Sequence, residues 1–167
     1  MGWINLREFG IKDSLILKFM KEFKSFESFI RDENLRILDK NIRAKVLLAA
    51  LHDNRKLYEK LQESNIRLIE YTRDDYPEHL RNIQDPPLFL YVARNIKFGE
   101  RNIGVVGTRR NTIYGKVYCE SILKELLEYD VNIVSGLALG IDTIAHEFTL
   151  KKNCRCIGVV GSGLDKI

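Results

Sequence analysis

The chain contains few of the residues that build cross-linked or metal-centred proteins. Its 167 residues include three cysteines, an odd number, at positions 119, 154 and 156. Cys154 and Cys156 are two apart and would share one face of a predicted strand, whereas a four-ligand zinc site needs partners that the sequence does not place nearby. We therefore expect reduced, buried thiols, with neither a disulfide framework nor a metal site.

Long apolar runs and a strong excess of one charge are also missing. No window approaches the roughly 18 apolar residues of a membrane span, and no apolar stretch follows a basic N-terminus. The 27 basic and 23 acidic side chains leave a net charge of +4, which permits an anionic partner but does not by itself identify one. With 45% hydrophobic residues the chain can bury a core. We expect a globular cytoplasmic protein with no membrane partner.

Proline and glycine are scarce in the first sixty residues, where the sequence has a helical period. The segments "DSLILKFMKEFKSFESFI" and "NIRAKVLLAALHDNRKLYEKLQE" repeat apolar residues at i, i+3 and i+4, with Asp13 as a candidate N-cap of the first. This pattern predicts a small helical domain over residues 1–64. Its charges are mixed and show no exposed ladder of arginine and aromatic residues, which favours a packing or interaction module over direct nucleic-acid binding.

Residues 65–100 form a predicted junction that contains all three prolines. A short strand, an Asp-Asp-Tyr-Pro turn and a brief helix precede the doublet Pro86-Pro87 and the apolar run "LFLYVA". The two prolines exclude helix and favour an extended entry into a second strand. Tyr76 and Pro77 are explained by a rigid turn.

Strands and helices alternate over residues 101–167. The segments "NIGVVG", "VNIVSG" and "CRCIGVVGSG" predict buried strands, with helices over "YGKVYCESILKELLEYD" and "DTIAHEFTLKK" between them. Apolar strands joined by helices indicate a parallel sheet with right-handed crossovers. The predicted fold class is therefore α/β, with a small helical domain followed by a partial Rossmann-like parallel sheet. Ligands of such sheets bind beyond the carboxyl ends of the strands, where Gly107, Gly136 and Gly161 fall.

The turn in "VVGTRRNTIYG" combines glycine, a hydroxyl and two arginines before a predicted helix. It matches neither the dinucleotide fingerprint G-x-G-x-x-G nor the Walker loop, which argues against a tight NAD site and kinase-type chemistry. Backbone N–H groups after Gly107, the Thr108 hydroxyl and the guanidinium groups of Arg109 and Arg110 would converge near a helix N-terminus, which favours phosphate. The alternative is that one arginine merely pairs with a surface carboxylate.

A second glycine-containing loop follows the next strand, in "SGLALGIDTIAH". Gly136 and Gly140 would let a ligand approach the backbone, and Asp142 is placed to cap the following helix. His146 lies four residues later on the same helix face, where we expect it to support the site. Nothing in the sequence indicates a catalytic residue or a cofactor.

Four segments resemble the DprA (Smf) family of DNA-processing proteins in order and spacing. These are "YPEHLRNIQDPPLFLY", "VVGTRRNTIYG", "VSGLALGIDTIAH" and "GVVGSGLD", which together span residues 76–165. The helical N-terminus, with "ILKFMKEFKSFESFI", is similar to the family's small SAM-like domain, although Gly10 alone stands for its usual glycine pair.

The resemblance implies binding of single-stranded DNA and loading of the recombinase RecA during natural transformation, with no accepted catalytic step. The family's G-[ST]-R turn falls on Gly107, Thr108 and Arg109, and its S-G-x-A-x-G-[IV]-D loop begins at Ser135 and ends at Asp142. The predicted phosphate-binding residues are Gly107, Thr108, Arg109, Arg110, Ser135, Gly136 and Gly140, supported by Asp142 and His146.

Two other functions remain open at this point. One is an enzyme of the phosphoribohydrolase type, which uses a P-G-G-x-G-T loop and a glutamate where this chain has only "GSGLD". The other is an interaction protein that acts through its helical domain. The chain ends at "GLDKI", where the family continues into the second half of the sheet, so it resembles the family's N-terminal part. An unpaired sheet edge predicts weak stability or self-association as a homo-oligomer.

Overall fold

The computed structural model describes residues 2–93, 96, 98 and 101–164. The chain divides into two compact units, residues 1–95 and 96–167. In this division the strands of the predicted junction belong to the same unit as the helices. The three predicted domains, residues 1–64, 65–100 and 101–167, remain a prediction. Among the described residues, none of the helices has the length and apolar character needed to cross a membrane.

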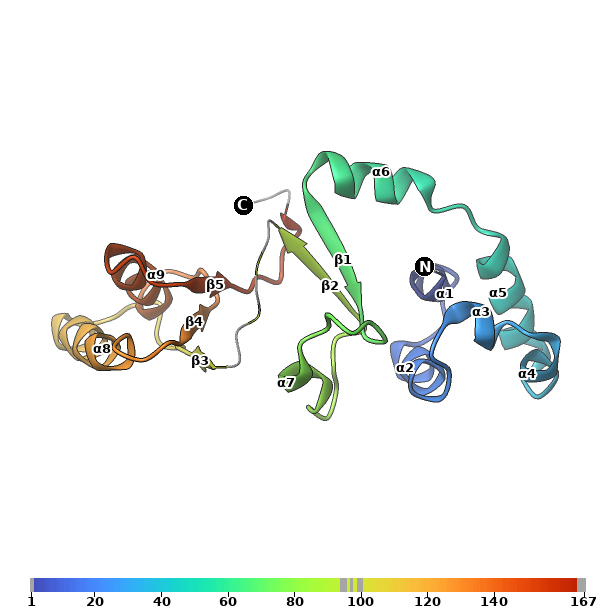
Figure 1. The fold of residues 1–167 in the computed structure, drawn as a ribbon, viewed down its shortest axis with the longest axis horizontal. Coiled ribbons are helices and arrows are strands. Elements are labelled where there is room, and N and C mark those ends of the chain that lie inside the picture. The colour runs from blue at the N-terminus through green and yellow to red at the C-terminus, as the bar shows by residue number, and fades with distance from the viewer. Residues whose placement is uncertain (1, 94–95, 97, 99–100, 165–167) are drawn as a thin grey trace. The chain divides into compact units, whose positions relative to one another are not determined.

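The first unit opens with a group of short helices (Figure 1). Aromatic side chains form the core between them. The Phe29 ring stacks on Phe19 at 4.5 Å and on Trp3 at 5.4 Å between centroids, and Phe26 meets Trp3 edge-on. These four side chains are buried, so they supply much of the apolar area that holds the helices together. The helices are α1 (Trp3–Glu8), α2 (Asp13–Glu22), α3 (Phe26–Phe29), α4 (Asp32–Arg36), α5 (Lys40–Leu51) and α6 (Arg55–Glu63).

Helix boundaries in this unit differ from the predicted ones. The helical period of residues 13–30 is interrupted before Ser25, which starts α3 with a reciprocal capping box to Ser28. Asp13 is not an N-cap, because Lys12 occupies that position and makes no side-chain cap. The period of residues 41–63 is likewise interrupted between α5 and α6, where the Asp53 carboxylate accepts a hydrogen bond from the Arg55 backbone N–H. Local side-chain hydrogen bonds thus override the apolar period.

A β-hairpin completes the first unit. Strands β1 (Ile66–Glu70) and β2 (Phe89–Ala93) pair antiparallel, with Ile66 opposite Ala93, and α7 (Glu78–Arg81) lies in the connection between them. The buried Tyr76 donates its hydroxyl to the Pro87 carbonyl at 2.8 Å. The Arg81 guanidinium lies 5.3 Å from the Tyr76 ring centroid. Tyr76 therefore holds the two ends of the connection together.

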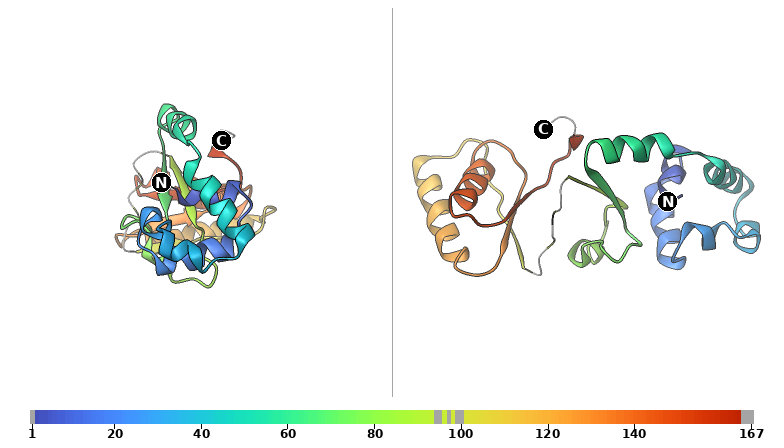
Figure 2. Two further views of the ribbon diagram at one scale, coloured as in Figure 1. Left: turned by 90° about the vertical axis from the view of Figure 1, so that its right-hand side faces the viewer. Right: turned by 45° about the horizontal axis from the view of Figure 1, so that its top comes forward.

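The second unit is a parallel sheet with two helices on one face (Figures 1 and 2). Its elements are β3 (Asn102–Gly104), α8 (Ile113–Leu126), β4 (Asn132–Ser135), α9 (Ile141–Lys151) and β5 (Cys156–Gly158), with the strands in the order β3-β4-β5. Leu123 from α8, Ile133 from β4 and Ala145 from α9 share one core. The predicted α/β class and parallel sheet are confirmed.

The three cysteines lie in this unit as free thiols. All three are only half-buried, so the expected full burial is wrong. Strand β5 begins at Cys156, which leaves Cys154 outside the strand, contrary to the prediction that both share a strand face. Burial raises the pKa of the Cys119 and Cys156 thiols, which keeps both protonated near neutral pH.

Candidate functional site

The loops that follow the parallel strands begin at one edge of the sheet. Ile103, Ile133 and Cys156 lie in register across the three strands. The ladder continues one residue past the strand ends, because Val105 N–H donates to Val134 C=O and Val159 N–H donates to Ser135 C=O. The chain segments after these residues therefore leave the sheet side by side, at the edge where parallel sheets bind ligands.

The arginine turn, residues 107–110, lies between β3 and α8 and is exposed along its whole length. The Thr108 hydroxyl accepts a hydrogen bond from the Arg110 N–H at 3.1 Å, which closes a small side-chain turn. Two residues further on, Thr112 caps α8 by accepting from the Gly115 N–H. No acidic residue lies in the first turn of α8, so the positive end of the helix dipole is not neutralised there.

A main-chain contact fixes the arginine turn against the glycine loop, residues 136–140. The Ile141 N–H donates to the Thr108 carbonyl at 3.2 Å. Gly140 has φ +87°, and a Cβ there would lie 2.1 Å from the Thr108 oxygen and 2.8 Å from the Arg109 Cα. Only glycine allows this approach.

Side chains of α9 lie close to the glycines at positions 107 and 136. A Cβ on Gly107 would lie 2.6 Å from the Ile141 side chain, and one on Gly136 would lie 2.8 Å from Asp142 Oδ2. Gly136 and Gly140 let the chain pack closely against itself, which sets the shape of the edge. That Gly136 and Gly140 also let a ligand reach the backbone stays a prediction.

Asp142 organises the glycine loop from within α9. Its carboxylate is buried and accepts a hydrogen bond from the Gly136 N–H at 3.2 Å. The prediction that it caps α9 is wrong, since Gly140 occupies the N-cap position and no side chain caps the helix. His146 is buried one turn further along α9. In the described part of the chain, neither Asp142 Oδ1 nor His146 Nε2 has a hydrogen-bond partner.

Ser135 also stabilises this edge of the sheet and is buried from solvent. Its hydroxyl donates to the Val105 carbonyl at 2.7 Å and so ties the end of β4 to the end of β3. Thr143 makes a comparable bond from α9 to the Ala138 carbonyl at 2.8 Å. Because these side chains form hydrogen bonds within the protein, the exposed side chains of the predicted site are those of the arginine turn.

Arg109 and Arg110 are the open cations of this edge. Among the residues that the structure describes, neither guanidinium forms an ion pair or a side-chain hydrogen bond. The alternative in which one of them pairs with a surface carboxylate is therefore not what the structure shows. Their N–H donors are free to bind an anion. A guanidinium is planar and can donate two parallel hydrogen bonds, which suits phosphate well.

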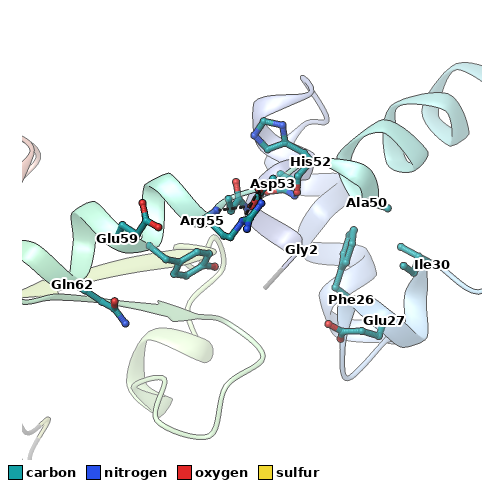
Figure 3. A pocket seen from close by; sticks show the side chains of 13 residues that line it. Gly2, Phe26, Glu27, Ile30, Ala50, His52, Asp53, Arg55, Glu59 and Gln62 are labelled. Carbon is teal, nitrogen blue, oxygen red and sulfur yellow. Dashed lines mark hydrogen bonds and ion pairs between the residues drawn. The ribbon is translucent and has the colours of Figure 1, made fainter.

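A different kind of surface lies in the first unit, where a cavity of about 620 Å³ opens beside α3, α5 and α6 (Figure 3). Phe26, Ile30 and Ala50 form its apolar wall. Some of its polar groups are already paired: the Asn5 amide donates to the Ala49 carbonyl at 2.7 Å, and Arg55 pairs with Asp53 at 2.6 Å. No sequence motif marks this cavity, because residues far apart in the chain line it.

A smaller neighbouring cavity, of about 210 Å³, contains a buried acid that the sequence analysis missed. Glu70 is 8% exposed, and its Oε1 has no hydrogen-bond partner among the described residues. Burial raises the pKa of Glu70, and burial together with the nearby Glu70 raises the pKa of Tyr58 to about 12. Glu70 ends an apolar strand, so only the tertiary structure shows that its side chain is enclosed.

No metal centre stands out in the described residues, where no cluster of three or more His, Cys, Asp or Glu side chains is arranged to hold an ion. The expectation that the protein works without a metal stays a prediction.

Comparisons with known proteins agree with this architecture. Residues 67–167 match the family described as DNA recombination-mediator protein A. The chain is 33% identical to the DNA processing protein DprA of Bacillus subtilis, over 94% of this chain and 54% of that protein. It is 40% identical to the DNA processing protein DprA of Streptococcus pneumoniae, over 55% of this chain and 33% of that protein.

A solved structure shows the same fold. The X-ray structure of DprA from Streptococcus pneumoniae superposes with a TM-score of 0.71 and 25% identity, covering 99% of this chain and 59% of that one. The chain spans about half the length of the curated relative from Bacillus subtilis. The family match covers more than half of the residues and includes the arginine turn and the glycine loop. This chain therefore belongs to the DNA recombination-mediator protein A (DprA) family of DNA-processing proteins.

Proposed function

We propose that the second unit binds single-stranded DNA by holding its phosphates at the arginine turn. The observation that carries this proposal is the pair of exposed guanidinium groups, Arg109 and Arg110, without a carboxylate partner among the described residues. They stand on a turn whose backbone is fixed by Gly140, so little order has to be gained on binding.

Family membership supports a wider role for the protein. We propose that the protein is cytoplasmic, acts without catalysis or a cofactor, and helps to load a RecA-type recombinase onto DNA. Self-association as a homo-oligomer belongs to the same proposal. The relatives' names, which describe DNA processing, support this direction, and no feature of the site favours the phosphoribohydrolase alternative.

Titration of fluorescent oligo-dT against the wild type, Arg109→Ala and Arg110→Ala at several salt concentrations tests the site. Loss of one charge-assisted contact should cost about 1.5 to 3 kcal/mol in Arg109→Ala, and the salt slope should fall by about 0.7. The loss should be similar for all base sequences, because phosphates carry no sequence information. We expect a smaller loss for Arg110→Ala, since the Arg109 backbone, not that of Arg110, packs against Gly140.

Arg155→Ala is the matched control, because it removes one charge from an exposed arginine of the same unit that already pairs with Asp130 at 2.5 Å. An equal loss in Arg155→Ala would mean that net charge, not the turn, governs binding. If the wild type binds and Arg109→Ala matches it in affinity and slope, the proposed phosphate site is wrong. Release of nucleobase from AMP above a buffer control would favour the enzyme alternative.

A further inference from the structure

The first two turns of α8 expose an unusual set of apolar and aromatic side chains. Tyr114 is 77% exposed and Tyr118 is 67% exposed, and Ile113 and Val117 beside them are also open to solvent. Tyr114 and Tyr118 are four residues apart, so they lie on the same face of the helix as neighbours. Contiguous exposed apolar side chains of this kind mark a binding surface more often than scattered ones do.

This face begins where the arginine turn ends. Thr112 caps α8, and Tyr114 is the second residue of the helix, within about 3 Å of the cap along the helix axis at about 1.5 Å per residue. Arg109, Arg110 and Lys116 supply positive charge nearby, and no acidic residue lies in the first turn of the helix. Glu120 approaches Lys116 only at 3.9 Å.

Aromatic rings beside unpaired cations fit one occupant in particular, a single-stranded nucleic acid. Its phosphates need the cations and its unstacked bases need π-faces, whereas the bases of a duplex are already stacked on one another. We propose that Tyr114 and Tyr118 form a base-stacking platform that works together with the phosphates held at the arginine turn. This inference rests on the proposed function and adds to it a contact with the bases themselves.

The experiment compares two ligands of equal charge: oligo-dT and an oligomer of the same length made of abasic sites. Tyr114→Ala and Tyr118→Ala are each expected to weaken binding to oligo-dT about tenfold and to leave binding to the abasic oligomer unchanged. Arg109→Ala should weaken binding to both. Tyr114→Phe should retain the affinity of the wild type, since stacking needs the ring and not the hydroxyl.

Tyr129→Ala is the matched control, because Tyr129 is 65% exposed in the same unit but lies beyond the other end of α8. It should bind both oligomers as the wild type does. Since all three tyrosines are exposed, thermal unfolding of the variants should match that of the wild type.

The outcomes separate this inference from the proposed function. If Arg109→Ala loses affinity while Tyr114→Ala and Tyr118→Ala bind oligo-dT like the wild type, the phosphate site stands and the platform is wrong. Equal losses on both oligomers would also overturn the platform, since the contact would not be with bases. If the tyrosine variants instead disrupt self-association without a change in DNA affinity, the face is a contact between copies of the chain. If the wild type binds neither oligomer, both proposals fail.

Discussion

Three arginines of the first unit differ from the two arginines of the arginine turn in the second unit, because among the described residues only the former have carboxylate partners. In the first unit, Arg7 pairs with Asp13 at 3.1 Å, and Arg55 and Arg73 pair with the nearby Asp53 and Asp75. In the second unit, Arg109 and Arg110 stand on a fixed turn, and no carboxylate of the described residues reaches them. A guanidinium that already has a carboxylate offers little to a ligand, whereas an open one can exchange water for phosphate.

This contrast explains why the overall charge does not locate the site. A net charge of +4 is modest, and most of the basic side chains are spread over both units. Exposed ion pairs add little stability, so their main effect here is to occupy donors. The presence or absence of carboxylate partners, and not the number of cations, distinguishes the paired arginines of the first unit from the two arginines that can bind an anion.

Removal of the central ring of the aromatic core should have the largest effect. Phe29 is 1% exposed, so Phe29→Ala should lower the free energy of unfolding of the first unit by about 3 to 5 kcal/mol. Binding of oligo-dT should persist, because the arginine turn belongs to the other unit. Circular dichroism melting and a fluorescence titration measure the two effects, with the exposed Ile37→Ala as control. A parallel loss of DNA affinity would show that the two units do not act separately.

A substitution at Gly140 should produce the reverse pattern. Gly140→Ala places a methyl group against the Thr108 carbonyl at φ +87°, which should cost about 1 to 3 kcal/mol and displace the arginine turn. We expect weaker binding of oligo-dT and an unchanged helical unit. Gly104→Ala is the control, since a Cβ there meets no atom within 4 Å. If Gly140→Ala binds DNA as the wild type does, the turn does not depend on this contact.

Tyr76→Phe should also destabilise the first unit without affecting DNA binding, but by less than Phe29→Ala does. Loss of the hydroxyl removes the hydrogen bond to the Pro87 carbonyl, at a cost of about 1 kcal/mol to the first unit. Tyr91→Phe is a control from the same hairpin with a partly exposed hydroxyl-bearing ring. Melting temperatures should distinguish the two variants, while both should bind oligo-dT equally well. Reduced DNA affinity in Tyr76→Phe alone would assign this turn a role beyond the fold.

Glu70 should give the smallest effect and one that depends on pH. Because burial raises the pKa of Glu70 in the folded state above its ordinary value of 4.5, the folded protein retains this proton to higher pH than the unfolded chain does. Stability from this group is therefore lost as pH rises from 4.5 through the folded pKa. Glu70→Gln should be more stable than the wild type at pH 7, and the difference should shrink toward pH 4.

Chemical denaturation at several pH values measures this dependence. Glu59→Gln, at an exposed position of the same unit, should leave the pH profile unchanged. A wild type that is more stable than Glu70→Gln at pH 7 would mean that the ionised carboxylate has a favourable partner.

The sequence predicted those parts of the molecule that depend on neighbouring residues. The parallel sheet and the position of the arginine turn follow from short apolar runs and from the glycine, hydroxyl and arginine side by side in "GTRR". The hydrogen bond of Asp142 did not follow, because its carboxylate reaches back to Gly136 in the preceding loop and does not cap the helix as expected. The burial of Glu70 was also hidden, since it arises from packing between segments distant in sequence.

The contact at Gly140 affects how the sequence of the arginine turn can evolve. The arginine turn is positioned by main-chain atoms of Thr108 and Arg109 and by the Thr108 hydroxyl. Its backbone path therefore does not depend on the side chains of Arg109 and Arg110. Substitutions at these two arginines can therefore alter the charge and size of the molecule that the turn accepts, one residue at a time, without a change in the backbone. The same property is useful for protein engineering. Substitution of Arg109 and Arg110 would change the chemistry of the surface, while the contact at Gly140 would preserve the backbone of the turn.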